Sequence, residues 1–373
     1  MTKKISSSTD AVNIAWISDI HLGHRRVPTK KIIAYLESLF NDKTFPNYKA
    51  IVISGDLFDK RLAHDSEEAM LVSFWMTDMC VLAKRHNVSI VVLLGTPSHD
   101  QGQPKWFVSI NSRISSIGAD VRYYDKITVD KLYPGGPDTL FIPDEMNHVA
   151  DTTYKEAVEV IKLAGLDKVK VAVMHGMFHF QEPIRTVVSH DEAKYHEIVE
   201  HLIIIGHHHT NAEFGIIRVP GSIERLRHGE EEDKGHIETL YSPTQGVLEE
   251  RFIVNKNADI FSTIDMQGWP LNEVISHLMT LNHLPDGSRL RLLVSRHDEA
   301  YSGMPGIKNK FPHFSIEPKV AELVKSNKDT TELIARPVMT SIRPDTLKGL
   351  VMPRIKDVSA ETLKAIEAKL DQL

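Results

Sequence analysis

Five apolar stretches of this sequence each run directly into histidine or aspartate, side chains that bind divalent metal ions. Apolar runs of about four to eight residues are typical of buried parallel strands, and α/β folds place their sites at the C-terminal ends of such strands. The series therefore predicts a dinuclear metal hydrolase. The stretches are WISDIH with Asp19 and His21, VISGD with Asp56, VVLLGTPSHD with His99 and Asp100, VAVMHG with His175, and LIIIGHHH with His207, His208 and His209.

The spacing of these residues suits a pair of metal ions. Two divalent ions about 3.5 to 4 Å apart can clamp a phosphoryl group, generate hydroxide at neutral pH and stabilise the leaving oxygen. Such a pair needs carboxylates as bridges and imidazoles in the remaining positions. Asp19 and His21 are two positions apart, so an extended backbone directs both to the same side, and His207 and His209 repeat this spacing. Asp56 follows a glycine, which permits a sharp turn and leaves room for metals.

Each motif alone is weakly informative. An isolated Asp-x-His or Gly-Asp pair also occurs at polar strand ends and turns. The histidines at 207–209 could form a solvated loop, but the apolar run at 202–205 directly before them favours ligation. His208 alternates away from its two neighbours, and we interpret it as structural or solvent-facing. The ordered series of five strand ends argues against coincidence and favours a metal site.

Helical patterns separate the apolar stretches and give the strand and helix alternation of a layered α/β domain. The second helical pattern carries Trp75, Met76 and Met79 at helical spacing, which predicts packing in the core. The sequence Pro-Gly-Gly-Pro within 132–138 excludes a helix or a central strand and predicts a turn. The helical patterns cover residues 29–41, 66–87, 152–164 and 190–200.

The ordered series resembles that of the calcineurin-like metallophosphoesterases over residues 11–255. A more specific stretch, VPGSIERLRHGEEEDKGH at 219–236, looks like the Pro-Gly-Ser, Glu-Arg, Gly-Glu and Lys-Gly sequence that closes the phosphoesterase domain of SbcD-type double-strand-break-repair nucleases. The resemblance implies a layered α/β fold with two central sheets flanked by helices. It also implies a small α+β cap domain at the C-terminal side.

The resemblance further implies which residues hold the metals. Asp56 would bridge the two ions, and His99, backed by Asp100, would stabilise or protonate the leaving 3′ oxygen. The preferred metal of the family is Mn²⁺, with Mg²⁺ as the alternative. The first ion would be held by Asp19, His21, Asp56 and His209, and the second by Asp56, His175, His207 and Ser98.

Two positions depart from the family pattern. Where the family carries Gly-Asn-His, this chain has GTPSH at 95–99, so Ser98 replaces the amide ligand. A serine oxygen is a poorer donor than an amide carbonyl for hard cations, which predicts weaker binding of the second metal ion. Asp59, in GDLFD, stands where many of these nucleases have a histidine near the phosphate. A carboxylate there could repel phosphate or add to the metal field, and so alter the balance of exonuclease and endonuclease activity.

The pattern divides the chain into four parts. We expect a flexible lead at 1–10, the phosphoesterase nuclease domain at 11–255, a DNA-binding cap at 256–358 and an amphipathic helix at 359–373, which opens with Ser-x-Glu. In the cap, residues 260–266 and 289–295 are predicted strands with a helix at 270–282 between them. Basic residues of the cap could contact phosphates or form an ordinary solvated surface, and they are Arg289, Arg291, Arg296, Lys308 and Lys310.

Composition sets further limits on this chain of 373 residues. The single cysteine, Cys80, excludes an intramolecular disulfide and is expected to be a buried thiol; with no signal-like N-terminus, it favours a reducing cytoplasm. No apolar run reaches the roughly 18 residues that a membrane span requires. The net charge of −6 counts mildly against a nucleic-acid binder.

Together these features predict a metal-dependent DNA exonuclease with endonuclease capacity. Water held between the two metals would attack the phosphodiester while His99 assists the leaving group. The resemblance implies a homodimer and an SbcC-type coiled-coil ATPase partner, since the chain lacks a Gly-x-x-x-x-Gly-Lys-Ser/Thr loop of its own. The alternatives are a metallophosphoesterase acting on a phosphoprotein or small phosphoester, and a non-catalytic binding scaffold.

Overall fold

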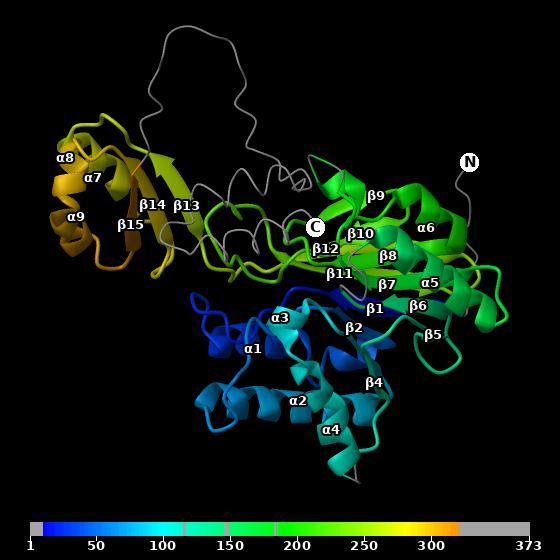
Figure 1. Ribbon diagram of the computed structural model, residues 1–373. Helices are drawn as coiled ribbons and strands as arrows, with labels where there is room; N and C mark the ends of the chain where they lie inside the picture. Colours follow the sequence, from blue (N-terminus) through cyan, green and yellow to red (C-terminus); the bar gives the residue numbers. More distant parts are fainter. Residues whose placement is uncertain (1–9, 115–116, 145–148, 183, 185, 321–373) are drawn as a thin grey trace, which may run out of the picture. The chain divides into compact units, whose positions relative to one another are not determined.

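Two six-stranded sheets dominate the part of the chain that this computed structural model describes, residues 10–114, 117–144, 149–182, 184 and 186–320 (Figure 1). The first sheet has the order β12 (Gly246–Val254), β11 (Gly235–Ser242), β1 (Val12–Ile17), β2 (Ala50–Ser54), β3 (Ser89–Leu93) and β4 (Val121–Tyr124). Strands β1 to β4 are parallel, and β11 and β12 extend the sheet as antiparallel strands beside β1.

The second sheet is also mixed. Its order is β5 (Thr128–Lys131), β6 (Asp138–Ile142), β7 (Val169–His175), β8 (Val199–Gly206), β10 (Ile217–Val219) and β9 (Ala212–Phe214). The four inner strands β6, β7, β8 and β10 are parallel, while β5 and β9 are antiparallel edges. The predicted Pro-Gly-Gly-Pro turn joins β5 to β6.

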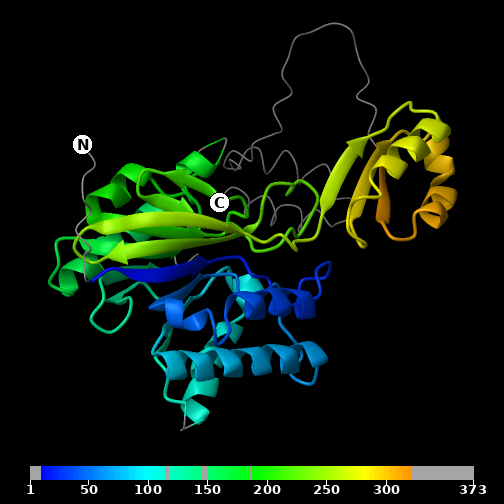
Figure 2. The same ribbon diagram turned by 180° about the vertical axis from the view of Figure 1, so that it is seen from behind.

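Helices cover the outer face of each sheet, as Figures 1 and 2 show. Those on the first sheet are α1 (Thr29–Leu39), α2 (Glu67–His86) and α4 (Trp106–Arg113), and those on the second are α5 (Ala150–Leu163) and α6 (Glu192–Ile198). The last predicted helix is shorter than expected, because Val199 already begins β8. Short turns complete this part: α3 (Pro97–Asp100), η1 (Phe45–Asn47), η2 (Gln103–Lys105) and η3 (His179–Gln181).

The central strands are buried on both faces. In β1, Ile14 and Trp16 pack into the core between the sheets, whereas Ala15 and Ile17 pack against the helices of the first sheet. Burial of one such large apolar side chain stabilises the fold by about 1.5 to 3 kcal/mol. The predicted layered α/β fold, with two central sheets flanked by helices, is therefore confirmed.

Helix α2 begins and ends where its sequence predicts. The Ser66 side chain caps it by accepting a hydrogen bond from the Ala69 amide at 3.1 Å, and Asn87 ends it in the left-handed conformation with φ of 55°. Its buried face includes Trp75, Met76, Met79 and Cys80, as expected, and the Cys80 thiol is free.

A third sheet follows the two large ones along the chain. Strand β12 ends at Val254, and the parallel strands β13 (Phe261–Asp265), β14 (Arg289–Val294) and β15 (Ser315–Val320) form a sheet of three. Together with α7 (Leu271–Thr280), α8 (Glu299–Ser302) and α9 (Met304–Lys310), they enclose a separate apolar core. The predicted strands at 260–266 and 289–295 and the helix between them are confirmed. The lead at 1–9, the end of the expected cap and the helix at 359–373 lie outside the described residues.

None of the helices in the described ranges is long and apolar enough to cross a membrane.

Candidate metal centre

The predicted metal-binding residues gather at the C-terminal ends of four strands from both large sheets. Asp19 and His21 follow β1, Asp56 follows β2, His175 ends β7, and His207 and His209 follow β8. Three groups have ligand atoms that all lie within 4.8 Å of one another: Asp19, His21 and His209; Asp56, His175 and His207; and His21, Asp56 and His99. These mostly buried clusters could hold metal ions.

The backbone at these residues adopts an uncommon conformation. Asp19, His21, Asp56 and His207 have φ values of 50°, 55°, 47° and 96°. Non-glycine residues rarely occupy this region, and such strain collects at functional sites where the surrounding structure enforces it. Four such residues in one cluster support a functional role for it.

Two glycines make the close approach of the strands feasible. A Cβ atom at Gly55 would lie 2.1 Å from His175 Nδ1, and one at Gly206 would lie 2.0 Å from Ser18 Oγ and 2.3 Å from the Ser54 carbonyl. Any side chain at either position would therefore push the strand ends apart.

In the first group, two imidazoles face each other. His21 Nε2 lies 3.2 Å from His209 Nε2. The other nitrogen of each ring faces a carboxylate: His209 Nδ1 lies 2.9 Å from Glu230 Oε1, and His21 Nδ1 lies 3.3 Å from Asp59 Oδ1. The carboxylates favour protonation of both Nδ1 atoms, which directs two Nε2 lone pairs at the same point. A cation at that point satisfies both.

Asp19 is fixed by hydrogen bonds beside this pair. Its carboxylate accepts from the Ser18 hydroxyl at 2.5 Å and from the His207 amide at 3.1 Å. One carboxylate oxygen lies 3.9 Å from His209 Nε2. The first group therefore offers one oxygen and two nitrogen donors.

In the second group, a hydrogen bond again fixes the orientation of a histidine ring. His175 Nδ1 lies 2.7 Å from the Ser54 carbonyl, to which only a protonated Nδ1 can donate, so Nε2 is the ring nitrogen that a metal ion could use. That Nε2 is buried without a hydrogen-bond partner among the described residues and lies 3.3 Å from Asp56 Oδ1. Asp56 also lies 3.8 Å from His21 Nε2, so its carboxylate stands between the two groups. This donor set of carboxylates and imidazoles fits divalent metal ions.

The charge balance of the cluster also favours a cation. Burial alone would raise the pKa of Asp56, but His175, His99 and His21 hold it well below its usual value. Burial lowers the pKa of His175, yet Asp56 raises it above the usual value. Burial lowers the pKa of His207, and neighbouring His175 lowers it further. A bound divalent ion would supply the positive charge that the buried carboxylates attract.

The predicted catalytic pair requires one correction. His99 lies in the site, with Nδ1 3.0 Å from Asp56 Oδ2 and a side chain 39% exposed. Asp100 does not back it: the Asp100 carboxylate is buried and accepts from the amides of Phe58 at 2.9 Å and Gly95 at 2.7 Å. Adjacent residues in the helical turn α3 point about 100° apart, so Asp100 faces the interior and anchors two loops.

The structure also places Ser98 differently from the expectation. Ser98 is exposed on α3. The hydroxyl that faces the cluster belongs to Thr96, whose Oγ1 lies 3.3 Å from Asp56 Oδ2 and 3.4 Å from His207 Nδ1. The Thr96 amide also donates to Asp56 at 2.5 Å. His208 contacts the Thr210 carbonyl rather than the cluster residues, as its alternation suggested.

Two residues that contact the cluster, Thr96 and Glu230, were not predicted from the sequence pattern. Thr96 carries no signal of its own, because the spacing from His99 favours the residue directly before that histidine. Glu230 lies within the motif at 219–236, and its position in that motif is the available signal for a role beside His209.

A further acidic group lies outside the cluster. His179, Asp191 and Glu192 have ligand atoms within 4.8 Å of one another. Asp191 caps α6 by accepting from the Ala193 amide, and Glu192 accepts from the Phe180 amide. Both carboxylates thus have structural partners.

Comparisons with known proteins do not assign a family. No protein-family model matches the sequence, and no curated protein matches it. A crystal structure of TT1561 from Thermus thermophilus is similar at a TM-score of 0.37 and 14% identity, covering 65% of this chain and 99% of its own. A second crystal structure has the same TM-score of 0.37 at 11% identity, covering 65% of this chain and 100% of its own. Similarity this distant carries no conclusion about activity.

Proposed function

We propose that this protein is a two-metal phosphodiesterase that cleaves DNA, an exonuclease with endonuclease capacity. The observation that carries the proposal is the position of Asp56 between two groups of donors, which matches a bridging carboxylate. Two bound divalent ions, most simply Mn²⁺, would supply an activated water and neutralise the charge on the phosphoryl group.

The residues around the cluster suit the remaining steps. His99 Nδ1 contacts Asp56, so its Nε2 is free to hold a proton for the leaving oxygen. Hydrogen bonding to Asp56 raises the pKa of His99, although burial lowers it, and the net rise favours the protonated ring that a general acid needs. Asp59 and Glu230 hold the rings of His21 and His209 in place.

The choice of DNA as substrate rests on the resemblance of 219–236 to SbcD-type nucleases and on the third sheet, which we assign as a DNA-binding cap. Some of its basic side chains are engaged: Arg291 pairs with Glu317 at 2.5 Å. Arg296, Lys308 and Lys310 are exposed and remain suited to phosphate contacts. The same proposal includes a homodimer and an SbcC-type ATPase partner.

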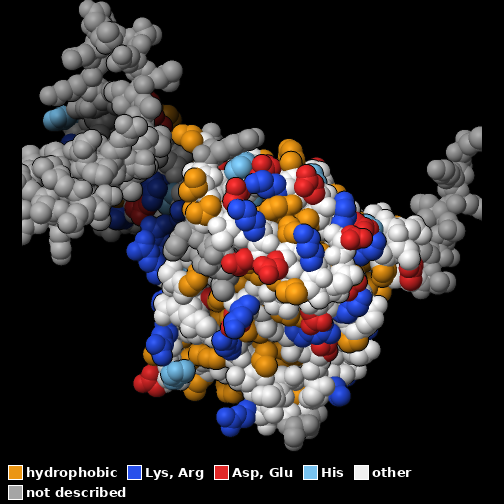
Figure 3. Space-filling model, turned by 45° about the vertical axis from the view of Figure 1, so that its right-hand side comes forward, with side chains coloured by type: hydrophobic (Ala, Val, Ile, Leu, Met, Phe, Trp, Pro, Cys, Tyr) orange, Lys and Arg blue, Asp and Glu red, His pale blue; other side chains and the backbone are white. Residues whose placement is uncertain are grey.

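A second candidate function is hydrolysis of a phosphoprotein or small phosphoester. The net charge of −6 favours it. Acidic and basic side chains are interspersed over the middle of the face in Figure 3 and do not gather there into one basic patch.

The deciding experiment is Mn²⁺-dependent degradation of end-labelled duplex and hairpin DNA by the full chain. We expect cleavage that a chelator abolishes and that His99→Ala slows by about 10²-fold or more. His208→Ala is the matched control, since His208 lies in the same triple histidine but outside the cluster, and it should cleave normally. Hydrolysis of bis(p-nitrophenyl) phosphate without DNA cleavage would favour the second candidate, and neither activity would overturn both.

A further inference from the structure

The loop after β6 carries a buried carboxylate to which no role has been given. Asp144 is 5% exposed, and its Oδ2 has no hydrogen-bond partner among the described residues. A buried polar oxygen without a partner has lost the hydrogen bonds of water and gained none in return, which is unfavourable. A carboxylate kept in such a place calls for a partner of opposite charge.

The backbone holds Asp144 beside the loop from which the last predicted ligand was expected. The Asp144 amide donates to the Leu94 carbonyl at 3.4 Å, and Leu94 directly precedes the turn of Gly95 and Thr96. Thr96 in turn contacts Asp56 and His207. Asp144 therefore reaches the second group from the end of β6 in the second sheet, beside the start of the 95–99 loop.

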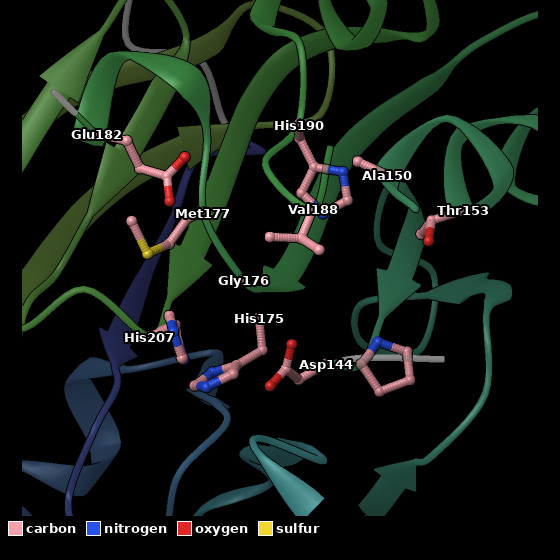
Figure 4. Close-up of a pocket in the computed structure, with 11 residues that line it drawn as sticks. Asp144, Ala150, Thr153, His175, Gly176, Met177, Glu182, Val188, His190 and His207 are labelled. Carbon is pink, nitrogen blue, oxygen red and sulfur yellow. The ribbon is translucent and has the colours of Figure 1, made fainter. Parts of the chain in front are cut away.

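A cavity joins this carboxylate to the second group. Asp144, His175 and His207 line a cavity of about 90 Å³. In Figure 4, the Asp144 carboxylate is turned toward the His175 ring. A cavity of this size, with these three polar side chains in its lining, has room for an ordered water molecule.

We propose that Asp144 is an acidic partner of the second cation and contacts it through an ordered water molecule in this cavity. A water is invoked because Asp144 is not among the residues whose ligand atoms lie mutually within 4.8 Å. Asp144 would thus supply the oxygen donor on that side of the second cation, because Ser98 stands in place of the expected amide ligand and is exposed. The inference rests on the proposed two-metal function and names a residue that the sequence series did not contain.

The test is equilibrium binding of Mn²⁺ to the full chain, by isothermal titration calorimetry and by electron paramagnetic resonance. We expect two ions per wild-type chain, and in Asp144→Asn one unchanged ion and a second bound at least about tenfold more weakly. Asp138→Asn is the control. Asp138 begins β6, the strand that leads to Asp144, and pairs with Lys131 at 2.8 Å, so this variant should bind both ions normally. Unchanged binding of both ions by Asp144→Asn would overturn the inference, whereas a wild-type chain that binds no Mn²⁺ would overturn the proposed function itself.

Unfolding in denaturant gives a second readout. Without metal, Asp144→Asn should be at least as stable as the wild type, because it replaces a buried carboxylate whose Oδ2 has no hydrogen-bond partner among the described residues. With saturating Mn²⁺, the wild type should become the more stable of the two, since it binds the second ion more tightly. A variant that is less stable under both conditions would indicate a purely structural Asp144 and contradict the assignment.

Discussion

The imidazoles of the cluster are oriented by groups that would not themselves touch a metal. Two rings have one nitrogen hydrogen-bonded, His209 with Glu230 and His175 with the Ser54 carbonyl, and His21 Nδ1 lies 3.3 Å from Asp59 Oδ1. This arrangement fixes which nitrogen carries the proton and where the other points. Asp59 places a carboxylate beside the His21 ring.

Glu230→Gln is expected to weaken binding of the first cation. Burial would raise the pKa of Glu230, but His209 and other contacts lower it to about 2, so this residue is a carboxylate at neutral pH. The amide keeps the shape but not the charge that holds the proton on His209 Nδ1. We expect Mn²⁺ affinity to fall about 10- to 100-fold in calorimetric titrations.

The control for this change is Glu249→Gln, which neutralises an exposed carboxylate on β12. It should leave Mn²⁺ affinity unchanged. Equal affinity of Glu230→Gln and Glu249→Gln would show that Glu230 does not position His209.

At the scale of elements, parallel strands from two sheets end at one place, and glycine permits their approach. Gly206 ends β8 where Ser18 and the Ser54 carbonyl leave no room for a side chain. The cluster therefore depends on the packing of strand ends as much as on its ligands.

Gly206→Ala should destabilise the chain. The added Cβ would meet the Ser54 backbone at 2.3 Å, which cannot move without shifting β2, and we expect a loss of at least about 2 kcal/mol in the free energy of unfolding. Denaturant unfolding with a chelator present measures this loss without a contribution from metal.

Gly306→Ala provides the matched control. Gly306 lies in α9, where an added Cβ meets nothing within 4 Å, so alanine should be neutral or stabilise by up to about 1 kcal/mol. Equal losses at both glycines would refute the steric account of Gly206.

The elements show how far the sequence alone reaches. Apolar runs ending in aspartate or histidine predicted β1, β2, β7 and β8 together with their site residues, because strand burial and strand-end position both follow local patterns. Pro97 starts a helical turn that exposes Ser98 and directs Asp100 inward, and linear spacing carries no such signal. Asp144 could not be predicted, because its role depends on contact with Leu94, a residue 50 positions away that no local pattern indicates.

At the scale of the whole molecule, one buried histidine outside the cluster, His190, is expected to make stability depend on pH. Burial lowers the pKa of His190 from 6.5 to about 4. The unfolded chain therefore binds a proton at this residue between those values while the folded chain does not, and stability falls as pH falls through that window.

His190→Gln should flatten this dependence. A shift from 6.5 to about 4 corresponds to about 3 kcal/mol of stability present above pH 6.5 and lost by pH 4. Denaturant unfolding at a series of pH values, with chelator present, should show a shallower slope in the variant. His283→Gln, at an exposed position, should keep the wild-type slope. The same slope in His190→Gln and the wild type would contradict this prediction.

The facing pair His21 and His209 also bears on how the chain folds. These residues are 188 positions apart, and they come from different sheets. Contacts at such separation form slowly, because closing long loops costs entropy before the contact gives anything in return. The proposed cation site would thus become complete only after both sheets have formed and docked. In refolding experiments, we expect tight Mn²⁺ binding to appear only in the last step of assembly. Added Mn²⁺ should not increase the folding rate of either sheet by itself.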